Sequence, residues 1–359
     1  MEGDFIKINK ALLPLSWIYG LGVGIRNLLF DLGIRRSYAF NTPVISVGNI
    51  TVGGTGKTPV TEYLVSLLMK NNKVAILSRG YKRSSRGFRL LSSQSTPEEV
   101  GDEPYQMKRK FPDVVVAVDA NRRRGISTLM KIEKESPEII LLDDAFQHRY
   151  VIPDISILLV DYNRMINEDA MLPVGMLREP EKAKNRADII VMTKCPEDLS
   201  SIQFKILQKN LSLYPYQSLY FTSLKYGDLV PLFPEDVKCV LKKSDLKRQT
   251  QILTVTGIAS PRPFEEHVKE YVDEIEGLNF SDHHRFSEKD YKKIESRFVA
   301  MSGEDRIIVT TEKDAVRMMN DALFPKSLKS LIYYIPLSVI FLRDQKRFDV
   351  KCFDYELVR

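Results

Sequence analysis

The sequence predicts an α/β protein with a doubly wound, mostly parallel sheet and a second, smaller α/β domain. Short, continuously apolar runs alternate with polar or amphipathic stretches between residues 43 and 194. Such runs are typical of parallel strands that helices cover on both faces. A glycine-rich loop follows the first run, and a shorter series of strand-like runs begins near residue 252. A chain of 359 residues is long enough for two domains.

The predicted strands fall into two groups. In the larger group, ligands are expected at the carboxyl ends of the strands, as in other open parallel sheets. A segment rich in Tyr, Phe and Pro, followed by a polar run, separates the two groups. The larger group covers residues 44–47, 74–77, 114–118, 139–142, 155–160 and 189–192, and the smaller one covers 252–256, 307–310 and 331–335.

These groups predict four segments of the chain. An N-terminal helical segment covers residues 1–36, and a larger domain covers 37–215. A linker region is expected at 216–250, where the composition shifts. A smaller C-terminal α/β domain is expected at 251–345.

The N-terminal segment contains an uncharged stretch between residues 11 and 25. Lys7 and Lys10 precede it, and Arg26, Arg35 and Arg36 follow it. The stretch is shorter than the roughly 20 apolar residues of a membrane-spanning helix, and it lacks the small-residue cleavage site of a signal peptide. Aromatic residues among leucines, flanked by cations, favour a helix that lies in an anionic membrane interface. The alternative is a buried core helix.

The glycine-rich loop has the pattern of a phosphate cradle, which predicts a P-loop NTPase-like fold. Its glycines let backbone N–H groups turn inward without Cβ clashes, Lys57 can reach the β- and γ-phosphates, and the Thr58 hydroxyl suits Mg²⁺. The usual pattern begins with glycine, where this chain has Thr51. The alternative is a glycine-rich turn with a chance lysine. The expected nucleotide-binding residues are Thr51, Val52, Gly53, Gly54, Thr55, Gly56, Lys57 and Thr58.

Two adjacent acids follow the apolar run at 139–142. Asp143 and Asp144 end a predicted buried strand, which is the usual second half of a nucleotide–Mg²⁺ site. The alternative is an acidic turn in which an Asp caps a helix. Gln147 and His148 come next and could contact a ligand, although a lone histidine is more often structural.

Other polar residues stand in predicted loops. Asp102 and Glu103 open a helical run, where the helix dipole favours acids. Asp282 and His283 could form a general base in which the Asp orients the imidazole, or they could belong to a polar loop that caps a helix. Further candidates for phosphate or substrate contact are Arg178 and Glu179 between two prolines, and Arg79 and Arg122 at predicted strand ends. Thr193 and Lys194 could touch a nucleotide base.

The overall composition is that of an ordinary globular protein with a small excess of positive charge. There are 53 Lys and Arg against 47 Asp and Glu, which gives a formal net charge of +6. This excess suits an anionic ligand or an anionic membrane surface. No motif of a nucleic-acid-binding module is present, so no nucleic acid is expected, and no protein partner is inferred. Three scattered cysteines indicate free thiols in a reducing cytoplasm.

Taken in order, these segments resemble the tetraacyldisaccharide 4′-kinase family of the lipid A pathway in Gram-negative bacteria. The resemblance covers nearly the whole chain. Ala145 is a departure, because the family usually reads D-D-G-F-Q-H, and alanine tolerates positive φ poorly. The matching segments are V-G-N-I-T-V-G-G-T-G-K-T-P from Val47, S-R-G-Y from Ser78, G-D-E-P from Gly101, L-D-D-A-F-Q-H from Leu142, L-P-V-G-M-L-R-E-P from Leu172, D-H from Asp282 and V-T-T-E-K-D-A-V-R from Val309.

The resemblance implies a reaction and a location. ATP would give its γ-phosphate to the 4′-hydroxyl of a tetraacylated glucosamine disaccharide 1-phosphate, with Mg²⁺. The enzyme would be peripheral on the cytoplasmic face of the inner membrane, held there by its N-terminal helix. Residues 37–215 would be the P-loop kinase domain, and the active site would lie between it and the smaller C-terminal domain.

The resemblance also implies roles for individual residues. Lys57 and Thr58 match the phosphate-loop lysine and the metal-binding threonine, and Asp143 and Asp144 match the paired acids near Mg²⁺. Asp102 and His283 match the two residues that form the base for the sugar hydroxyl. Domain closure would bring these two together. Arg178 and Glu179 match the loop near the transferring phosphate.

Two other function classes share part of this pattern. A P-loop ATPase or GTPase switch of the partitioning type would share the loop, the paired acids and a membrane helix, but it needs no base for a sugar hydroxyl. A soluble small-molecule ligase could use the same scaffold. The product distinguishes the three: phosphate in a lipid, free phosphate only, or ADP with a ligated product.

Overall fold

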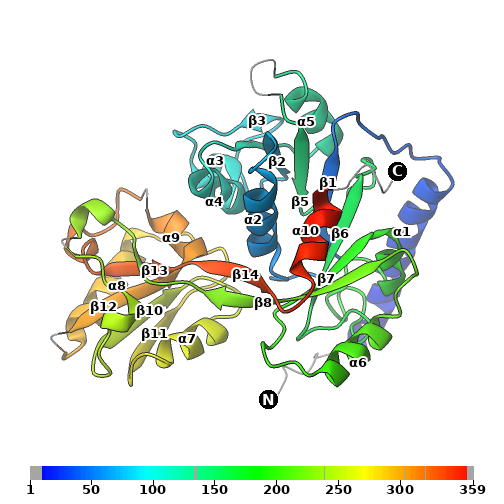
Figure 1. Cartoon of the computed structure of the whole chain (residues 1–359). Helices are drawn as coiled ribbons and strands as arrows, with labels where there is room; N and C mark the ends of the chain where they lie inside the picture. Colours follow the sequence, from blue (N-terminus) through cyan, green and yellow to red (C-terminus); the bar gives the residue numbers. More distant parts are fainter. Residues whose placement is uncertain (1–9, 133–135, 238, 304, 320, 354–359) are drawn as a thin grey trace. The chain divides into compact units, whose positions relative to one another are not determined.

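The structure is a computed structural model, which describes residues 10–132, 136–237, 239–303, 305–319 and 321–353. Lys7, one of the cations predicted to flank the N-terminal helix, lies outside the described residues. The chain divides into two compact units, Met1–Leu224 with Val339–Arg359, and Lys225–Ser338 (Figure 1). These bounds differ from the predicted ones. Residues 216–250 contain strands as well as loops, and residues 339–345 belong to the larger unit.

The larger unit is built on the predicted doubly wound sheet. Its nine strands have the order β14-β8-β7-β6-β1-β5-β2-β4-β3. Neighbouring strands from β8 to β4 run parallel, and β3 pairs antiparallel at the edge. Six strands were expected from the sequence: β1 (Val44–Asn49), β2 (Val74–Ser78), β4 (Val115–Val118), β5 (Ile139–Asp143), β6 (Ile155–Asp161) and β7 (Ile189–Thr193). The sequence did not predict β3 (Arg89–Leu90), β8 (Ser218–Tyr226) or β14 (Leu337–Phe341).

Helices alternate with these strands and cover the sheet. The helix α2 packs against β1 and β5, α4 against β4, and α5 against β2. Every residue of β1, β2 and β7 is buried, which explains why these strands read as unbroken apolar runs. The helices of this unit are α1 (Leu13–Asp31), α2 (Lys57–Leu68), α3 (Pro97–Val100), α4 (Asp102–Lys110), α5 (Arg122–Leu129), α6 (Ser201–Leu211) and α10 (Gln345–Phe353), with 3-10 turns η1 (Lys10–Leu12) and η2 (Glu181–Arg186).

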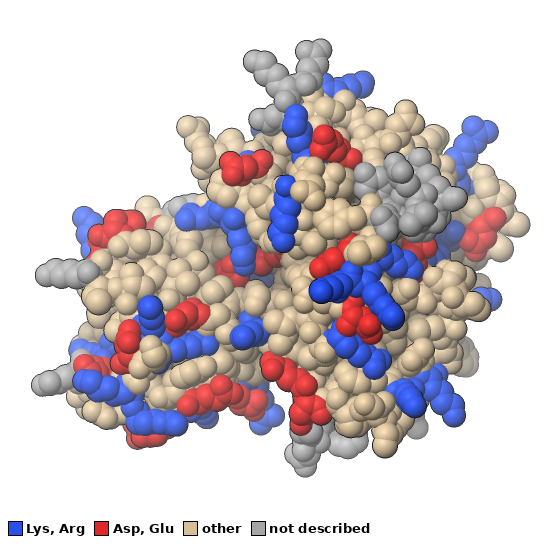
Figure 2. Space-filling view, viewed as in Figure 1, with Lys and Arg blue, Asp and Glu red and all other residues tan. Residues whose placement is uncertain are grey.

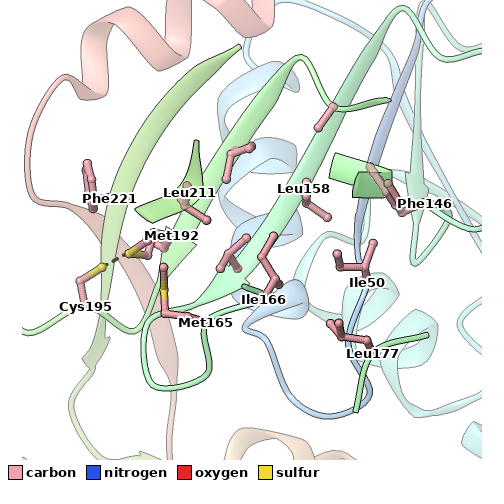
Figure 3. Packing of buried hydrophobic residues seen from close by; sticks show 14 of the residues in the cluster. Ile50, Phe146, Leu158, Met165, Ile166, Leu177, Met192, Cys195, Leu211 and Phe221 are labelled. Carbon is pink, nitrogen blue, oxygen red and sulfur yellow. Dashed lines mark hydrogen bonds between the residues drawn. The ribbon is translucent and has the colours of Figure 1, made fainter. Parts of the chain in front are cut away.

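One apolar cluster of the larger unit joins segments that are far apart in the sequence (Figure 3). Ile50 precedes the glycine-rich loop, Phe146 follows the paired acids, and Leu177 precedes Arg178, and all three are buried in this cluster. Each polar segment is therefore anchored by an apolar residue beside it. Burial of such side chains stabilises their position by about 1.5–3 kcal/mol each.

The C-terminal helix α10 packs beside α2 in the same unit (Figure 1). The Tyr63 hydroxyl of α2 donates to Asp349 Oδ1 at 2.6 Å and accepts from Gln345 Nε2 at 2.9 Å. The fully buried Phe348 packs against the Tyr63 ring at a centroid distance of 6.1 Å. The end of the chain thus supports the helix that follows the glycine-rich loop.

The smaller unit has its own five-stranded sheet with the order β11-β10-β12-β13-β9. Its strands are parallel except for the antiparallel pair β13–β9. Two apolar clusters lie in this unit, one around Tyr291 and Phe298 and one around Phe264. The strands are β9 (Val230–Pro231), β10 (Gln251–Thr256), β11 (Ile275–Asn279), β12 (Arg306–Thr311) and β13 (Ile332–Ile335). The helices are α7 (Arg262–Lys269), α8 (Glu288–Ala300) and α9 (Glu312–Met318), with 3-10 turns η3 (Pro234–Asp236), η4 (Lys243–Asp245) and η5 (Lys326–Leu328).

The N-terminal helix α1 has an unusual distribution of side chains for a helix on a protein surface. Its protein-facing side is partly polar, because Ser16 Oγ donates to Met171 O at 2.9 Å and Asn27 Nδ2 donates to Glu179 Oε2 at 3.1 Å. An amphipathic helix normally buries its apolar stripe. Here a stripe at three- and four-residue spacing is exposed instead: Ile18 (68%), Leu21 (65%), Ile25 (51%), Leu28 (53%) and Leu32 (64%), with Trp17 (73%) beside it.

Within the described ranges, no helix has both the length and the apolar character needed to cross a bilayer. On the face shown in Figure 2, basic and acidic side chains are intermixed. This mixture agrees with the small formal net charge of +6.

Candidate active site

The glycine-rich loop connects β1 to α2 and leaves its backbone open. Gly53 and Gly56 have positive φ values of 110° and 76°, which other residues rarely adopt. A Cβ placed at Gly53 or Gly54 would meet no described atom within 4 Å. The loop therefore has room for a ligand against its N–H groups, and these stand at the N-terminus of a 12-residue helix.

Polar contacts hold the loop in this shape. Asn49 Nδ2 donates to Thr55 Oγ1 at 2.8 Å, and Thr193 Oγ1 at the end of β7 donates to Thr55 O at 2.9 Å. Thr51, which stands where the usual pattern has glycine, is buried and 3% exposed. Its hydroxyl accepts from Asn49 Nδ2 at 3.4 Å. The threonine therefore serves as part of the support beneath the loop.

The loop also pairs with the segment that carries Arg178. Val52 N donates to Met176 O at 2.8 Å, and Arg178 N donates to Ile50 O at 2.7 Å. This short antiparallel pairing places the Arg178 backbone directly beside the start of the loop. The structure thus joins two segments that the sequence could only associate by resemblance.

Asp144 lies between two cations of the predicted site. Lys57 Nζ is 3.6 Å from Asp144 Oδ1, and Arg178 Nη1 is 3.4 Å from Asp144 Oδ2. Burial works against the charged carboxylate, but Lys57 and Arg178 outweigh it and hold the pKa of Asp144 below its ordinary value. These three side chains form a charged cluster at the open side of the loop, which we call the Asp144 cluster.

Asp143 lies one residue away in a different environment. It ends β5, opposite Val47 of β1, and its Oδ2 accepts from Ser78 Oγ at 3.2 Å. Burial, followed by the neighbouring Asp144 charge, raises the pKa of Asp143 to about 6. The pKa values of the two acids are therefore shifted in opposite directions. A cation bound beside Asp143 would favour its charged form and so lower its pKa.

The donors at this edge of the sheet suit Mg²⁺. The carboxylates of Asp143 and Asp144 and the Thr58 hydroxyl supply hard oxygen atoms, and Mg²⁺ usually completes its shell with water and phosphate oxygens. Within the described residues, no group of three or more His, Cys, Asp or Glu side chains could hold a metal. A site made of few protein ligands and a nucleotide is consistent with that observation.

The buried arginine Arg122 has a supporting position. It is 2% exposed, and its guanidinium donates to Asp119 O at 2.7 Å and to Asp143 O at 3.0 Å. Burial lowers the pKa of Arg122 to about 10. The predicted phosphate contact of Arg122 stays a prediction, while its observed contacts fix the backbone at the end of β5.

The residues after the paired acids face the N-terminal helix. Gln147 Nε2 donates to Asn49 O at 2.6 Å, and the Arg26 guanidinium donates to Gln147 O. Burial, together with the charges of Arg122, Arg26 and Arg79, lowers the pKa of His148 to about 4. His148 is therefore neutral near pH 7, and its predicted contact with a ligand stays a prediction.

Glu179 is buried under the N-terminal helix. It is 1% exposed, and its Oε2 accepts from Asn27 at 3.1 Å and from Arg186 at 2.8 Å. Tyr19 Oη donates to the neighbouring Arg178 O at 3.0 Å. The loop that carries Arg178 and Glu179 is therefore held between the glycine-rich loop and α1.

Asp102 begins α4, and close glycine contacts fix this start. Gly101 has φ 97°, and a Cβ on it would lie 3.1 Å from Tyr81 O. A Cβ on Gly80 would lie 2.6 Å from Val100 O. The S-R-G-Y and G-D-E-P segments meet at these two glycines, and Glu103 is near enough to Asp143 to raise its pKa. The start of α4 therefore belongs to the same edge of the sheet as the paired acids.

His283 belongs to the smaller unit, where charged side chains surround it. Lys313 Nζ is 3.1 Å from His283 Nε2, and Arg317 Nη2 is 3.3 Å from His283 Nδ1. The predicted orienting acid, Asp282, is farther away at 3.8 Å from Nε2. A neutral imidazole has only one acceptor nitrogen, so it can accept from only one of the two cations at a time.

The segment V-T-T-E-K-D-A-V-R forms the base of this group. Asp314 is fully buried and accepts from Gly257 N at 2.9 Å and from Thr311 Oγ1 at 2.7 Å. Arg317 Nη1 donates to Asp314 Oδ1 at 2.7 Å. The sequence shows this segment as a matching motif, but only the structure shows that it holds His283, which has a positive φ of 59°.

Ala145, which stands where the family usually has glycine, does not need a positive φ. The positive φ of this turn falls on Asp144, at 47°, and Ala145 packs in an apolar cluster with an exposure of 5%. Alanine is therefore compatible with this turn. Three further residues hold site residues in place, and no pattern in the sequence assigned them this role: Asn49 and Ser78 through hydrogen bonds, and Arg186 through an ion pair with Glu179.

Comparison with known proteins decides the family. The sequence matches the family model described as Tetraacyldisaccharide-1-P 4'-kinase over residues 8–352. The chain belongs to this family. The tetraacyldisaccharide 4'-kinase of Bacteroides thetaiotaomicron is 52% identical over 351 residues, which are 96% of this chain and 92% of that protein. The enzyme of the same name from Porphyromonas gingivalis is 41% identical over 96% of both chains.

A solved structure supports the fold. LpxK from Aquifex aeolicus, described as an "apo" form in complex with ATP, aligns with a TM-score of 0.73 and 29% identity. The alignment covers 96% of this chain and 98% of that one. The predicted fold class is confirmed, and so is the predicted enzyme class, a 4′-kinase of lipid A biosynthesis that uses ATP and Mg²⁺. The roles of individual side chains stay predictions that rest on the geometry above.

Replacement of Asp143 by Asn is expected to stabilise the ligand-free protein at neutral pH. The raised pKa of about 6, against an ordinary 3.8, means that the carboxyl favours the fold while protonated and loses this effect as pH rises through 6. Asn removes the penalty of up to about 3 kcal/mol. Urea denaturation should show the gain at about pH 7.5, and the gain should disappear as the pH falls below about 4.

The exposed Asp113 provides the control for this measurement. Asp113→Asn should leave the free energy of unfolding at neutral pH nearly unchanged. An equal gain for Asp143→Asn at both pH values would mean that the effect does not come from the ionisation of Asp143.

Proposed function

We propose that the chain transfers the γ-phosphate of ATP to the 4′-hydroxyl of a tetraacylated glucosamine disaccharide 1-phosphate. The observation that supports this most directly is the Asp144 cluster at the open side of the glycine-rich loop, where Lys57 and Arg178 are 3.6 and 3.4 Å from one carboxylate. Both cations can turn to phosphate oxygens when a nucleotide enters. The names of the relatives indicate the acceptor class.

Different groups of the site would bind the nucleotide and stabilise the charge of the transferring phosphate. The loop N–H groups would hold the phosphate tail, and Lys57 and Arg178 would neutralise charge that develops on the transferring group. Asp143, Asp144 and Thr58 would hold Mg²⁺, which when bound neutralises phosphate charge. Asp144 would then exchange its two cations for the metal.

Asp102 and His283 would activate the acceptor. A sugar hydroxyl must lose its proton as it attacks phosphorus, and a carboxylate assisted by an imidazole can accept it. Asp102 stands at the N-terminus of α4, and His283 is held between Lys313 and Arg317. The two residues belong to different units, so domain closure would assemble the base.

The N-terminal helix would lie in the anionic cytoplasmic face of the inner membrane. The exposed stripe from Ile18 to Leu32 offers apolar side chains to the lipid, and Trp17 is 73% exposed beside it. Arg35 and Arg36 are exposed just after the helix and would face anionic headgroups. Because α1 also contacts the backbone of Arg178, an acceptor that lives in the bilayer would arrive beside the Asp144 cluster.

The reaction is tested by product mass. Incubation with ATP, Mg²⁺ and acylated disaccharide monophosphate should add one phosphate to the lipid. Lys57→Ala should lower the rate on the order of 10²- to 10³-fold, because a cation aimed at the transferring group is lost. Free phosphate without a modified lipid would favour a switch ATPase instead. Unchanged transfer by Lys57→Ala would contradict the role of the loop.

The base is tested at Asp102. Asp102→Ala should lower the turnover number by about 10²-fold or more, since general base catalysis commonly contributes 10²- to 10⁴-fold. Binding of ATP should change little. Glu98→Gln, at an exposed position on the preceding helix α3, is the control and should keep normal turnover. Near-normal turnover of Asp102→Ala would exclude it as the base.

The membrane helix is tested by vesicle flotation. Glu substitutions at Trp17, Ile18 and Leu21 should move the protein from anionic vesicles to the unbound fraction, because they remove exposed apolar side chains without cutting the contacts of Ser16 and Asn27. Val299→Glu, at a 65% exposed site on α8, is the control. If the triple variant floats as well as the unsubstituted protein, α1 does not hold the membrane.

A further inference from the structure

The helix after the glycine-rich loop carries a buried acid that the reaction itself does not use. Glu62 lies in α2 and is 5% exposed. Its Oε1 accepts from Gln106 Nε2 at 2.8 Å, and its Oε2 accepts from Lys110 Nζ at 2.7 Å. Both donors belong to α4, so one carboxylate spans the gap between two helices.

Glu62 and its two donors lie on the same helix sides as predicted site residues. Asp102, Gln106 and Lys110 are spaced by four residues, so they lie along one side of α4. Thr58 and Glu62 are likewise four residues apart on α2. The carboxylate therefore connects the side of α2 that carries the predicted metal hydroxyl to the side of α4 that carries the predicted base.

The chemistry of the Glu62 contact suits a role in setting the position of α4 relative to α2. The Glu62 side chain is 6% exposed whereas that of Lys110 is 33% exposed, so the carboxylate bears most of the loss of hydration in this ion pair. In some proteins such a pair specifies the relative position of the groups that it joins. A buried carboxylate between an amide and an ammonium can be satisfied in few arrangements of the two helices.

We propose that Glu62 is a positioning residue that sets the place of Asp102 relative to the glycine-rich loop. This inference rests on the proposed function of Asp102 as part of the base. Two other contacts fix the N-terminal end of α4, where Gly80 and Gly101 meet. Glu62 contacts Gln106 and Lys110 farther along the helix, so α4 has polar contacts near both of its ends.

The first test separates turnover from nucleotide binding. Glu62→Ala should lower the turnover number roughly 10- to 100-fold, since a misplacement of about 1 Å can reduce a rate 10²-fold. The KM for ATP should change by less than about twofold, because the loop itself is intact. An unchanged turnover number would overturn the proposal, even if thermal stability falls.

A double-mutant cycle tests whether Glu62 acts through Asp102. In an Asp102→Asn background the base is already lost, so adding Glu62→Ala should change the residual rate less than about twofold. A general structural role would lower the rate equally in both backgrounds. That additive result would overturn the proposal while leaving the proposed reaction intact.

An exchange of the two hydrogen-bonding side chains provides the rescue. Glu62→Gln combined with Gln106→Glu keeps a bond between the helices and leaves the new carboxylate four residues from Lys110. Turnover should recover to within about threefold of the unsubstituted rate, well above that of Glu62→Gln alone. These two variants preserve side-chain volume, so they keep the proposal testable if Glu62→Ala does not fold, and a failed rescue would overturn it.

The wild-type measurement separates this inference from the proposed function. If the unsubstituted protein adds no phosphate to the acylated disaccharide, the proposed function fails and the role of Glu62 fails with it. If it does so but Asp102→Asn keeps near-normal turnover, the base assignment fails, and Glu62 cannot position it. An active protein with an additive cycle contradicts Glu62 alone.

Discussion

The site depends on how one carboxylate balances two cations at the end of β5. Asp144 has a positive φ of 47° and lies within 3.6 Å of Lys57 and 3.4 Å of Arg178. Without a ligand, this arrangement neutralises charges that would otherwise repel each other beside an open loop. A phosphate chain offers the same cations a stronger partner, so the resting contacts keep the side chains near the geometry that the reaction needs.

The rest of the larger unit keeps these groups in register. Ile50, Phe146 and Leu177 bury their side chains in one cluster directly beneath three polar segments. Gly48 allows Phe146 to approach β1, because a Cβ there would be only 2.7 Å from Phe146 Cβ. Close packing of this kind resists small shifts. The apolar contacts of this cluster therefore fix the positions of the neighbouring polar segments.

The sequence was sufficient for some parts of this structure and insufficient for others. Buried parallel strands such as β1 and β5 read as continuous apolar runs, and the loop carries a distinctive spacing, so both could be predicted. The strands β3 and β9 contain two residues each, and the sequence shows no period at that length. Pairing between the loop and Met176, or between Glu62 and α4, depends on long-range packing. The resemblance indicated that Arg178 lies near the loop, whereas only the structure shows the backbone hydrogen bonds that keep it there.

The larger unit is assembled from both ends of the chain, with residues 225–338 inserted between its parts. During synthesis α2 leaves the ribosome before the inserted residues, and β14 and α10 leave it after them. The nascent chain therefore holds a nearly complete parallel sheet whose phosphate-loop helix still lacks the aromatic cover of Phe348. The helix that follows the glycine-rich loop therefore completes this packing only after more than two hundred and eighty further residues, from Lys57 to Phe348, have been made.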